Sequence, residues 1–230
     1  MTFNSERSPR LERRWDLFVF DWDGTIMDTT ALIAIGIQKA CVAMGYPEPS
    51  LELCKSTIGL SWGDIIARAC PECPVSRYAE FGEHYRAWYL TREGDVPVVP
   101  GLERLLRNMH AAGLRLAVAT GKSRRGLDRV FARTGLGEVF EDSITADESF
   151  SKPNPAMLEE LSVRCAVPVE RMVMIGDAVF DLQMACNAGA AGVGVTFGAS
   201  SVETLAQCNP VGIAHTVEEL AAVLGVQDLL

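Results

Sequence analysis

Short apolar runs alternate with amphipathic stretches along most of this 230-residue chain. The apolar runs hold four to six residues, many of them branched or aromatic, which is typical of buried parallel strands. We expect strands over residues 17–20, 114–119, 143–146, 172–175 and 191–195 and near Ile213. Helical spacing predicts helices over residues 31–44, 101–112, 126–133, 155–165, 181–187 and 217–224. Strands that alternate with helices predict an α/β fold, with a Rossmann-like parallel sheet and helices on both faces.

The stretch that follows the first helix and ends near Pro97 has a different pattern. Helices are expected over residues 51–58, 62–69 and 75–92, and no strand pattern interrupts them. We therefore predict an inserted, small all-helical cap subdomain at residues 30–96, with an α/β core domain at 15–29 and 97–230. The third helix carries an aromatic stripe, which we interpret as packing between cap helices: Tyr78, Phe81, Tyr85, Trp88 and Tyr89. Residues 1–14 are polar and lack an apolar period, so we expect a disordered leader.

Composition narrows the classes of function. Apolar residues make up 48% of the chain and charged residues 22%, as in ordinary soluble globular proteins. No apolar run could span a bilayer and no signal peptide opens the chain, so we expect a cytoplasmic protein without a membrane partner. A net charge of −9 disfavours binding to nucleic acid. The seven cysteines are expected to be reduced thiols, and Cys70 and Cys73 lack nearby partners for a zinc site, so we interpret that pair as packing.

The stretch from Leu17 to Thr25 carries the first candidate chemistry. A buried strand ends there in Asp21 and Asp23, followed by Gly24. Ligands of open α/β sheets bind at the carboxyl ends of the strands. If the chain stays extended, both carboxylates point the same way, and their repulsion must be offset by a cation, a shared proton or a charge on the substrate, of which a cation such as Mg²⁺ is the simplest. An Asp carboxylate is also a competent nucleophile toward phosphorus, so the pair indicates phosphoryl transfer; the alternative is a solvated turn.

Three later positions follow strands in the same way. Thr120 and Gly121 offer a hydroxyl and a backbone amide to an anion, or Thr120 is only a helix cap. Lys152 precedes Pro153, which we place near the first turn of the next helix; its alternative is a surface charge. The segment Gly176 to Asp181 brings two more acids, of which Asp181 could simply be an N-terminal helix acid.

In order and spacing these positions resemble the four motifs of the haloacid dehalogenase superfamily. The first motif, DxDGT, is residues 21–25; the second is Thr120; the third is Lys152; and the fourth, GDxxxD, is residues 176–181. The resemblance covers nearly the whole chain after the leader. It implies that Asp21 attacks phosphorus and that Asp23 protonates the leaving oxygen and then activates water.

The resemblance also implies how the phosphate and a metal are held. Thr120 and the Gly121 amide would bind phosphoryl oxygens, and Lys152 would offset negative charge. The Mg²⁺ ion would be held by Asp21, by Asp23 through its backbone carbonyl, by Asp177 and, directly or through a second shell, by Asp181.

Departures from related subclasses refine the expected reaction. True dehalogenases lack the acid that Asp23 supplies. Phosphonate hydrolases share Trp22 and use a cap lysine, for which Lys55 is available, but they carry Ala at the position of Asp23. Sugar phosphomutases often carry Val where Thr25 stands. The loop of residues 58–62 is our candidate for the surface that meets the leaving group. Rim cations could come from Lys122, Arg124 and Arg125; the alternative is that these three residues form a solvated helix face.

The sequence therefore predicts a hydrolase: a Mg²⁺-dependent phosphomonoesterase that acts through an aspartyl-phosphate. It resembles the phosphoglycolate phosphatase-like group with a helical cap, so its expected substrate is a small phosphorylated metabolite, with 2-phosphoglycolate first. A sugar phosphomutase and a non-enzymatic binding or regulatory protein remain the alternatives. We expect a monomer or homodimer.

Overall fold

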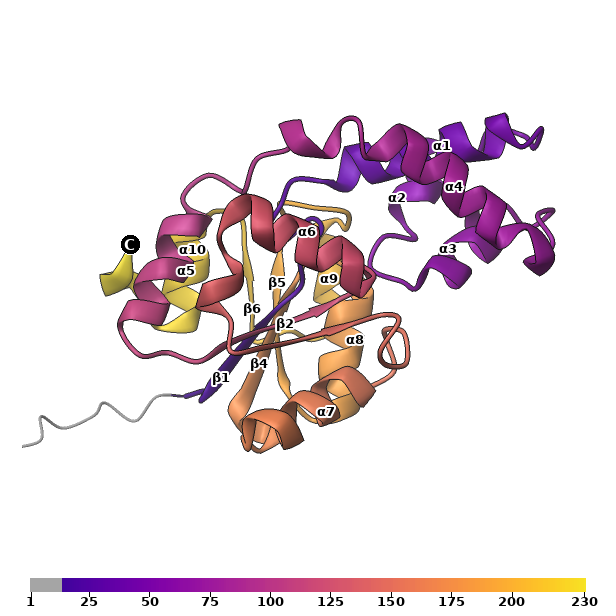
Figure 1. Cartoon of the computed structure of the whole chain (residues 1–230). Coiled ribbons are helices and arrows are strands. Elements are labelled where there is room, and N and C mark those ends of the chain that lie inside the picture. Colours follow the sequence, from indigo (N-terminus) through magenta and orange to yellow (C-terminus); the bar gives the residue numbers. More distant parts are fainter. Residues whose placement is uncertain (1–13) are drawn as a thin grey trace, which may run out of the picture.

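The computed structural model describes residues 14–230 and contains one six-stranded parallel sheet (Figure 1). The strands are β1 (Leu17–Phe20), β2 (Leu116–Thr120), β3 (Asp142–Thr145), β4 (Met172–Gly176), β5 (Ala191–Val195) and β6 (Gly212–Ala214). Their order across the sheet is β3-β2-β1-β4-β5-β6, and every neighbouring pair is parallel. The predicted α/β class with a Rossmann-like sheet is confirmed. Of the predicted leader, only Arg14 lies within the described residues.

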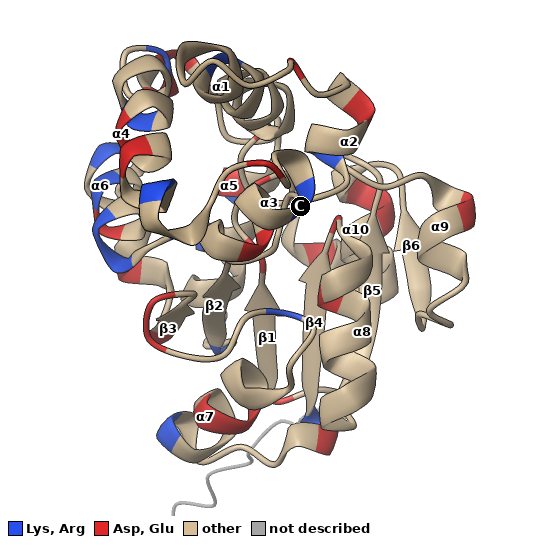
Figure 2. Ribbon diagram, turned by 90° about the vertical axis from the view of Figure 1, so that its right-hand side faces the viewer, with Lys and Arg blue, Asp and Glu red and all other residues tan. Residues whose placement is uncertain are grey.

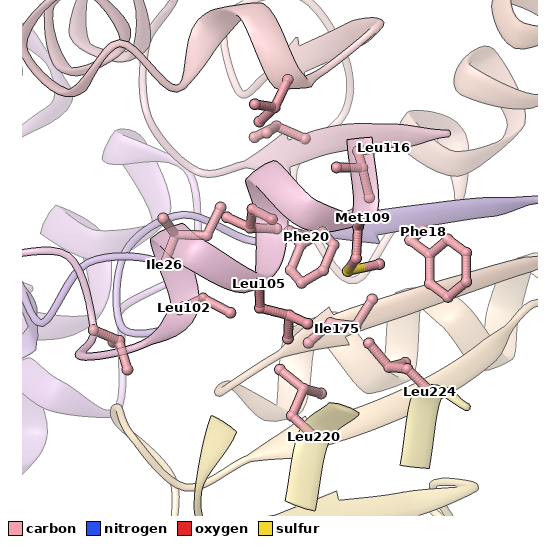
Figure 3. Close-up of a cluster of buried hydrophobic side chains, with 14 of the residues drawn as sticks. Phe18, Phe20, Ile26, Leu102, Leu105, Met109, Leu116, Ile175, Leu220 and Leu224 are labelled. Atoms are coloured by element: carbon pink, nitrogen blue, oxygen red, sulfur yellow. The ribbon is translucent and has the colours of Figure 1, made fainter. Parts of the chain in front are cut away.

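Helices cover both faces of the sheet because its central strands are apolar on both sides. In β1, Phe18 and Phe20 pack on one face, while Leu17 and Val19 pack on the other. The first face is covered by α5 (Leu102–Ala111), α6 (Arg124–Thr134) and α10 (Val217–Leu224). Figure 3 shows this layer, in which side chains of α5 and α10 meet the phenylalanines of β1. The second face is covered by α7 (Ala156–Cys165) and α8 (Val179–Ala188).

Four helices between β1 and α5 form a separate group beyond the carboxyl ends of the strands (Figure 1). They are α1 (Thr30–Ala43), α2 (Leu51–Lys55), α3 (Trp62–Ala69) and α4 (Tyr78–Tyr89), and we call them the helical insertion. The insertion has its own apolar cluster, in which Cys70 and Cys73 are buried, in agreement with their interpretation as packing. Ser50 and Ser61 cap α2 and α3 by accepting hydrogen bonds from Leu53 N and Asp64 N.

Some boundaries differ from the predicted ones. The helix predicted over residues 51–58 ends at Lys55. The helix predicted over residues 75–92 divides into a 3₁₀ turn (Val75–Arg77) and α4, which ends at Tyr89, and a second 3₁₀ turn follows at Glu93–Asp95. The placement of Pro153 in a first helical turn is wrong. Its bond to Lys152 is cis, and α7 begins only at Ala156, whose N–H is bound by the Asn154 side chain.

The remaining elements are short. The helix α9 (Val202–Ala206) was not predicted, because five residues are too few to display a helical period. Three more 3₁₀ turns lie at Gly137–Val139, Val169–Arg171 and Gln227–Leu229. Within residues 14–230, no helix combines the length and apolar character that crossing a membrane requires.

Candidate active site

The candidate site lies where the strand order of the sheet changes direction. From β1 the chain continues through β2 and β3 on one side, and β4 to β6 follow on the other side of β1. Loops after β1 and β4 therefore diverge to opposite faces and leave a crevice between them. Figure 2 shows β1 and β4 side by side, ending beneath the helical insertion. Asp21 follows β1 directly, and its N–H still donates to Ile175 O of β4.

Lys152 bridges two carboxylates at the base of this crevice. Its Nζ lies 2.8 Å from Asp21 Oδ1 and 2.6 Å from Asp181 Oδ1, and all three side chains are at most 2% exposed. Lys152 is thus a buried ion-pair partner and not the surface charge considered as an alternative. Burial lowers the pKa of Lys152, but the attraction of Asp181 and Asp21 more than offsets this effect, so the pKa of the ammonium is raised.

The nucleophile candidate Asp21 has one carboxylate oxygen without a partner. Burial raises the pKa of Asp21 to about 7, and the nearby Lys152 charge acts in the opposite direction. Its Oδ1 accepts from Lys152, whereas Oδ2 is buried and makes no hydrogen bond. A buried oxygen left without a donor is unfavourable unless a ligand or cation completes it. Asp21 also lines a cavity.

The site contains more negative than positive charge, which suits a divalent cation. Carboxylate oxygens of Asp21, Asp177 and Asp181 all lie within 4.8 Å of one another, and among residues 14–230 they are the only such group of potential metal ligands. Burial, together with the charges of Asp21 and Asp181, raises the pKa of Asp177 well above its ordinary value. One ammonium cannot balance three carboxylates. An all-oxygen ligand set of this kind fits Mg²⁺.

Asp177 is held in place by the first motif and by the loop after β5. Thr25 Oγ1 donates to Asp177 Oδ1 at 2.9 Å, and Ala199 N donates to Oδ2 at 2.7 Å. Gly24 packs directly against this carboxylate with a φ of +87°, so a side chain at position 24 would collide with Asp177. The glycine of the first motif is therefore required by the close approach of the fourth motif.

The carboxylate of Asp23 lies apart from the acidic group. Lys122 Nζ donates to both of its oxygens at 2.9 Å, and Thr29 Oγ1 donates to Oδ1 at 2.7 Å. Thr29 stands at the start of α1 but makes no capping bond there, because its hydroxyl is used by Asp23. Lys122 also reaches Tyr89 OH at 3.5 Å, which connects Asp23 with the helical insertion.

The second motif meets a loop of the insertion. Thr120 ends β2 and is 1% exposed, and its Oγ1 accepts from Lys122 N. A Cβ at Gly121 would lie 2.8 Å from Leu60 O, so this glycine allows the predicted loop of residues 58–62 to approach the strand end. Ser61 N of the same loop donates to Ser151 Oγ, beside Lys152, at 2.8 Å.

A cavity of about 550 Å³ opens from Asp21 and Asp23 toward the insertion. Thr120 and Gly121 line its floor, and Ile58, Gly59, Leu60 and Trp62 of the predicted loop line its wall. Of the expected rim cations, Lys122 and Arg125 line the cavity, whereas Arg124 pairs with Glu148. Lys55 is not among the lining residues.

The chain was compared with known proteins. A sequence model described as haloacid dehalogenase-like hydrolase matches residues 18–195. The chain belongs to the haloacid dehalogenase-like hydrolase family. A protein of Vibrio parahaemolyticus named phosphoglycolate phosphatase is 29% identical and aligns over 91% of this chain and 96% of its own length. A Vibrio cholerae protein of the same name is also 29% identical, over 90% of this chain and 96% of its own length. The crystal structure of a hydrolase from Pseudomonas syringae superposes with a TM-score of 0.82 at 21% identity, over 92% of this chain and 98% of that one.

The family matches the resemblance found from the motifs, and the structure brings the predicted residues to one edge of the sheet. Sequence reasoning missed three partners that act on them: Lys122 on Asp23, Thr29 on Asp23, and Thr25 on Asp177. Lys122 had been considered only as a rim cation. Its position two residues after Thr120 was the available signal, but nothing in the spacing identifies its partner.

Proposed function

We propose that this protein is a Mg²⁺-dependent phosphatase that hydrolyses small phosphomonoesters through an aspartyl-phosphate. One observation carries the proposal: Asp21 lines the cavity, is buried, and keeps one carboxylate oxygen free of hydrogen bonds. A carboxylate so placed can attack an electrophile that enters the cavity. The proteins named phosphoglycolate phosphatase, similar over nearly their whole length, support the same reaction class.

The proposed chemistry has two displacements at phosphorus. In the first, a carboxylate oxygen of Asp21 forms a bond to phosphorus, the ester P–O bond breaks, and Asp23 gives a proton to the departing oxygen. In the second, Asp23 takes a proton from a water molecule, whose oxygen attacks the same phosphorus and releases inorganic phosphate from Asp21. Thr120 and the Gly121 amide would hold the phosphoryl oxygens, and Lys152 would offset their charge.

The proposed metal ligands are those that the family resemblance implies, and the close approach of Asp21, Asp177 and Asp181 supports them. Asp21 and Asp177 would hold Mg²⁺ with their carboxylates, Asp23 with its backbone carbonyl, and Asp181 would support the site directly or through a second shell. When bound, the ion supplies positive charge that stabilises the negative charge on the transferring phosphoryl group. Lys152 already engages Asp181 Oδ1, while Ala178 N engages its Oδ2, which leaves Asp181 better placed to orient Lys152 than to ligate.

The helical insertion would act as the cap over this site. We place the cap at residues 30–96 and the core at residues 15–29 and 97–230. The contact of Ser61 with Ser151 and the close approach of Leu60 to Gly121 support a cap that closes on the phosphate end of the cavity. Among small phosphomonoesters, 2-phosphoglycolate is the first substrate to test, because the similar Vibrio proteins are named phosphoglycolate phosphatase. A cytoplasmic location and a monomeric or homodimeric state stay predictions.

Release of phosphate tests the proposal. Purified protein is incubated with 2-phosphoglycolate and other phosphomonoesters, with Mg²⁺ or with a chelator, and compared with Asp21→Asn. We expect Mg²⁺-dependent release that disappears in the variant, because a neutral amide cannot form the phosphoenzyme. Circular dichroism controls for folding of the variant. Release by folded Asp21→Asn at a near-normal rate would refute the nucleophile, and transfer to a second hydroxyl without release would indicate a mutase.

A further inference from the structure

Three aromatic side chains line the cavity on the side of the insertion. Trp62 and Tyr85 have ring centroids 4.5 Å apart, and Tyr85 stacks on Tyr89 with centroids 5.1 Å apart and planes inclined by 17°. We call these three residues the aromatic wall. Two of its members, Tyr85 and Tyr89, belong to the aromatic stripe that the sequence pattern predicts to pack between cap helices. Phe81 of the same helix does so, because it is fully buried in the insertion, but Tyr85 and Tyr89 contribute to the cavity.

The aromatic wall is continuous with the acid/base candidate. Lys122 Nζ lies 5.5 Å from the ring centroid of Tyr89 and 2.9 Å from both oxygens of Asp23. In the proposed reaction Asp23 protonates the oxygen of the leaving group. The body of that group must therefore begin beside Asp23 and extend from there along Tyr89 and Tyr85.

The rings are held in fixed positions, so they form a preorganised surface. Tyr85 packs against Gly36 of α1 so closely that a Cβ at position 36 would lie 2.8 Å from the ring. The ring is further held between Trp62 on one side and Tyr89 on the other. A ligand that contacts such a surface loses little free energy to ordering the protein.

The cavity is larger than 2-phosphoglycolate requires. A molecule of 2-phosphoglycolate has about nine non-hydrogen atoms, or at most roughly 270 Å³ if each is given the ~30 Å³ of a water molecule. This is about half of the 550 Å³ that the cavity offers. A two-carbon carboxylate would leave the aromatic wall uncovered: its charge would be met by lining cations such as Arg86 and Arg125, while the ring faces, which are electronegative, would contribute nothing to its binding.

We propose that the preferred substrates are phosphomonoesters whose leaving group carries an aromatic ring, seated on Tyr85 and Tyr89 and bounded by Trp62. This inference rests on the phosphatase activity proposed above. Burial of a ring of phenyl size in a preformed apolar site increases kcat/KM by about 10- to 100-fold over the same ester without the ring.

A matched pair of substrates separates ring binding from chemistry. In 3-phenylpropyl phosphate and propyl phosphate the leaving alcohols have nearly equal reactivity, so the ratio of their kcat/KM values reports the contribution of the ring. Release of phosphate is measured for both esters with Mg²⁺ present. We expect a ratio of about 10 to 100 for the wild type.

Two tyrosine variants locate the effect. Tyr85→Leu removes the central ring of the wall and should reduce the ratio by about tenfold. Tyr78→Leu makes the same chemical change on α4 at a residue that does not line the cavity, and it should retain the wild-type ratio. Turnover of propyl phosphate by each variant shows that its active site has folded.

The outcomes distinguish the two proposals. Turnover of both esters with equal kcat/KM would overturn the aromatic preference and leave the phosphatase standing. A high ratio that Tyr85→Leu does not change would overturn the assignment of the ring to this wall. Absence of Mg²⁺-dependent release from every ester, including p-nitrophenyl phosphate, would overturn the phosphatase and this inference with it.

Discussion

Replacement of Lys152 by Met removes the only ammonium between two buried carboxylates and preserves much of the side chain's volume. In the wild type, Nζ lies 2.8 Å from Asp21 and 2.6 Å from Asp181, and none of the three side chains has more than 2% of its surface exposed. Removal of one partner from a buried ion pair costs about 3–5 kcal/mol, because an uncompensated charge remains. We expect Lys152→Met to lower the free energy of unfolding by this amount near pH 8 without Mg²⁺.

The loss should depend on pH. Burial raises the pKa of Asp21 to about 7 even with Lys152 present, and the pKa rises further without the ammonium. An acid whose pKa is higher in the folded state than the unfolded value of about 3.9 destabilises the fold as the pH rises between these two values. The difference between Lys152→Met and the wild type should therefore be smaller at pH 5 than at pH 8.

Urea unfolding followed by tryptophan fluorescence measures both quantities at pH 5 and pH 8 in the presence of a chelator. Lys39→Met is the matched control, since Lys39 is half exposed and 3.9 Å from Glu48, and it should change the free energy of unfolding by less than about 0.5 kcal/mol. A loss below about 1 kcal/mol for Lys152→Met at pH 8 would refute the reasoning that this ammonium offsets the buried acids.

Three further predictions concern the loop contact, the acid/base pair and the metal. Gly121→Ala places a Cβ 2.8 Å from Leu60 O, so the loop of residues 58–62 must move. We expect kcat/KM to fall about 10-fold or more in steady-state assays. An unchanged kcat/KM would show that the loop can shift without affecting the site. Lys122→Met releases the carboxylate of Asp23, so kcat/KM, which covers only the steps up to departure of the leaving group, should fall about 100-fold for alkyl phosphates and much less for p-nitrophenyl phosphate, whose leaving group needs no proton. Equal losses of kcat/KM for the two kinds of ester would contradict a role through Asp23 in protonating the leaving group. Without metal, the free energy of unfolding should fall as the pH rises from about 4 toward 7, because the pKa of Asp21 is raised to about 7 in the folded state. Saturating Mg²⁺ should reverse that fall in thermal unfolding assays, because the ion binds only the folded protein. No effect of Mg²⁺ on unfolding would argue against the metal site.

Much of the fold could be predicted because local patterns and tertiary packing agree. The helix Val217–Leu224 has the predicted bounds, since Thr216 caps its start and Gly225 ends it. The helix α7 begins within one residue of the predicted start, but Pro153 lies before the helix and not in its first turn, because the Asn154 side chain binds Ala156 N, which the sequence does not show. Patterns identify periodic segments well and identify irregular loop geometry poorly.

The four motifs could be placed together from sequence because parallel strands end at one edge of a sheet. The pairing of Lys122 with Asp23 could not, since 99 positions separate the two residues and the choice of partner depends on how the side chains lie in space. The same holds for Tyr85. A helical period places Tyr85 on one stripe with Phe81. Only the position of the helical insertion above the core shows that the Phe81 ring packs inside the insertion while the Tyr85 ring lines the cavity.

The overall charge and the local charge of this protein act on different ligands. A net charge of −9 repels an extended polyanion on average over the surface. A small phosphate ester experiences mainly charges within about 8 Å at physiological salt. Lys122, Arg86 and Arg125 line the cavity, and within residues 14–230 the two arginines have no ion-pair partner, so their charge is available to an anion. An acidic protein can therefore disfavour an extended polyanion and still attract a small phosphate ester, because screening confines the interactions of a small ligand to the cavity that it enters.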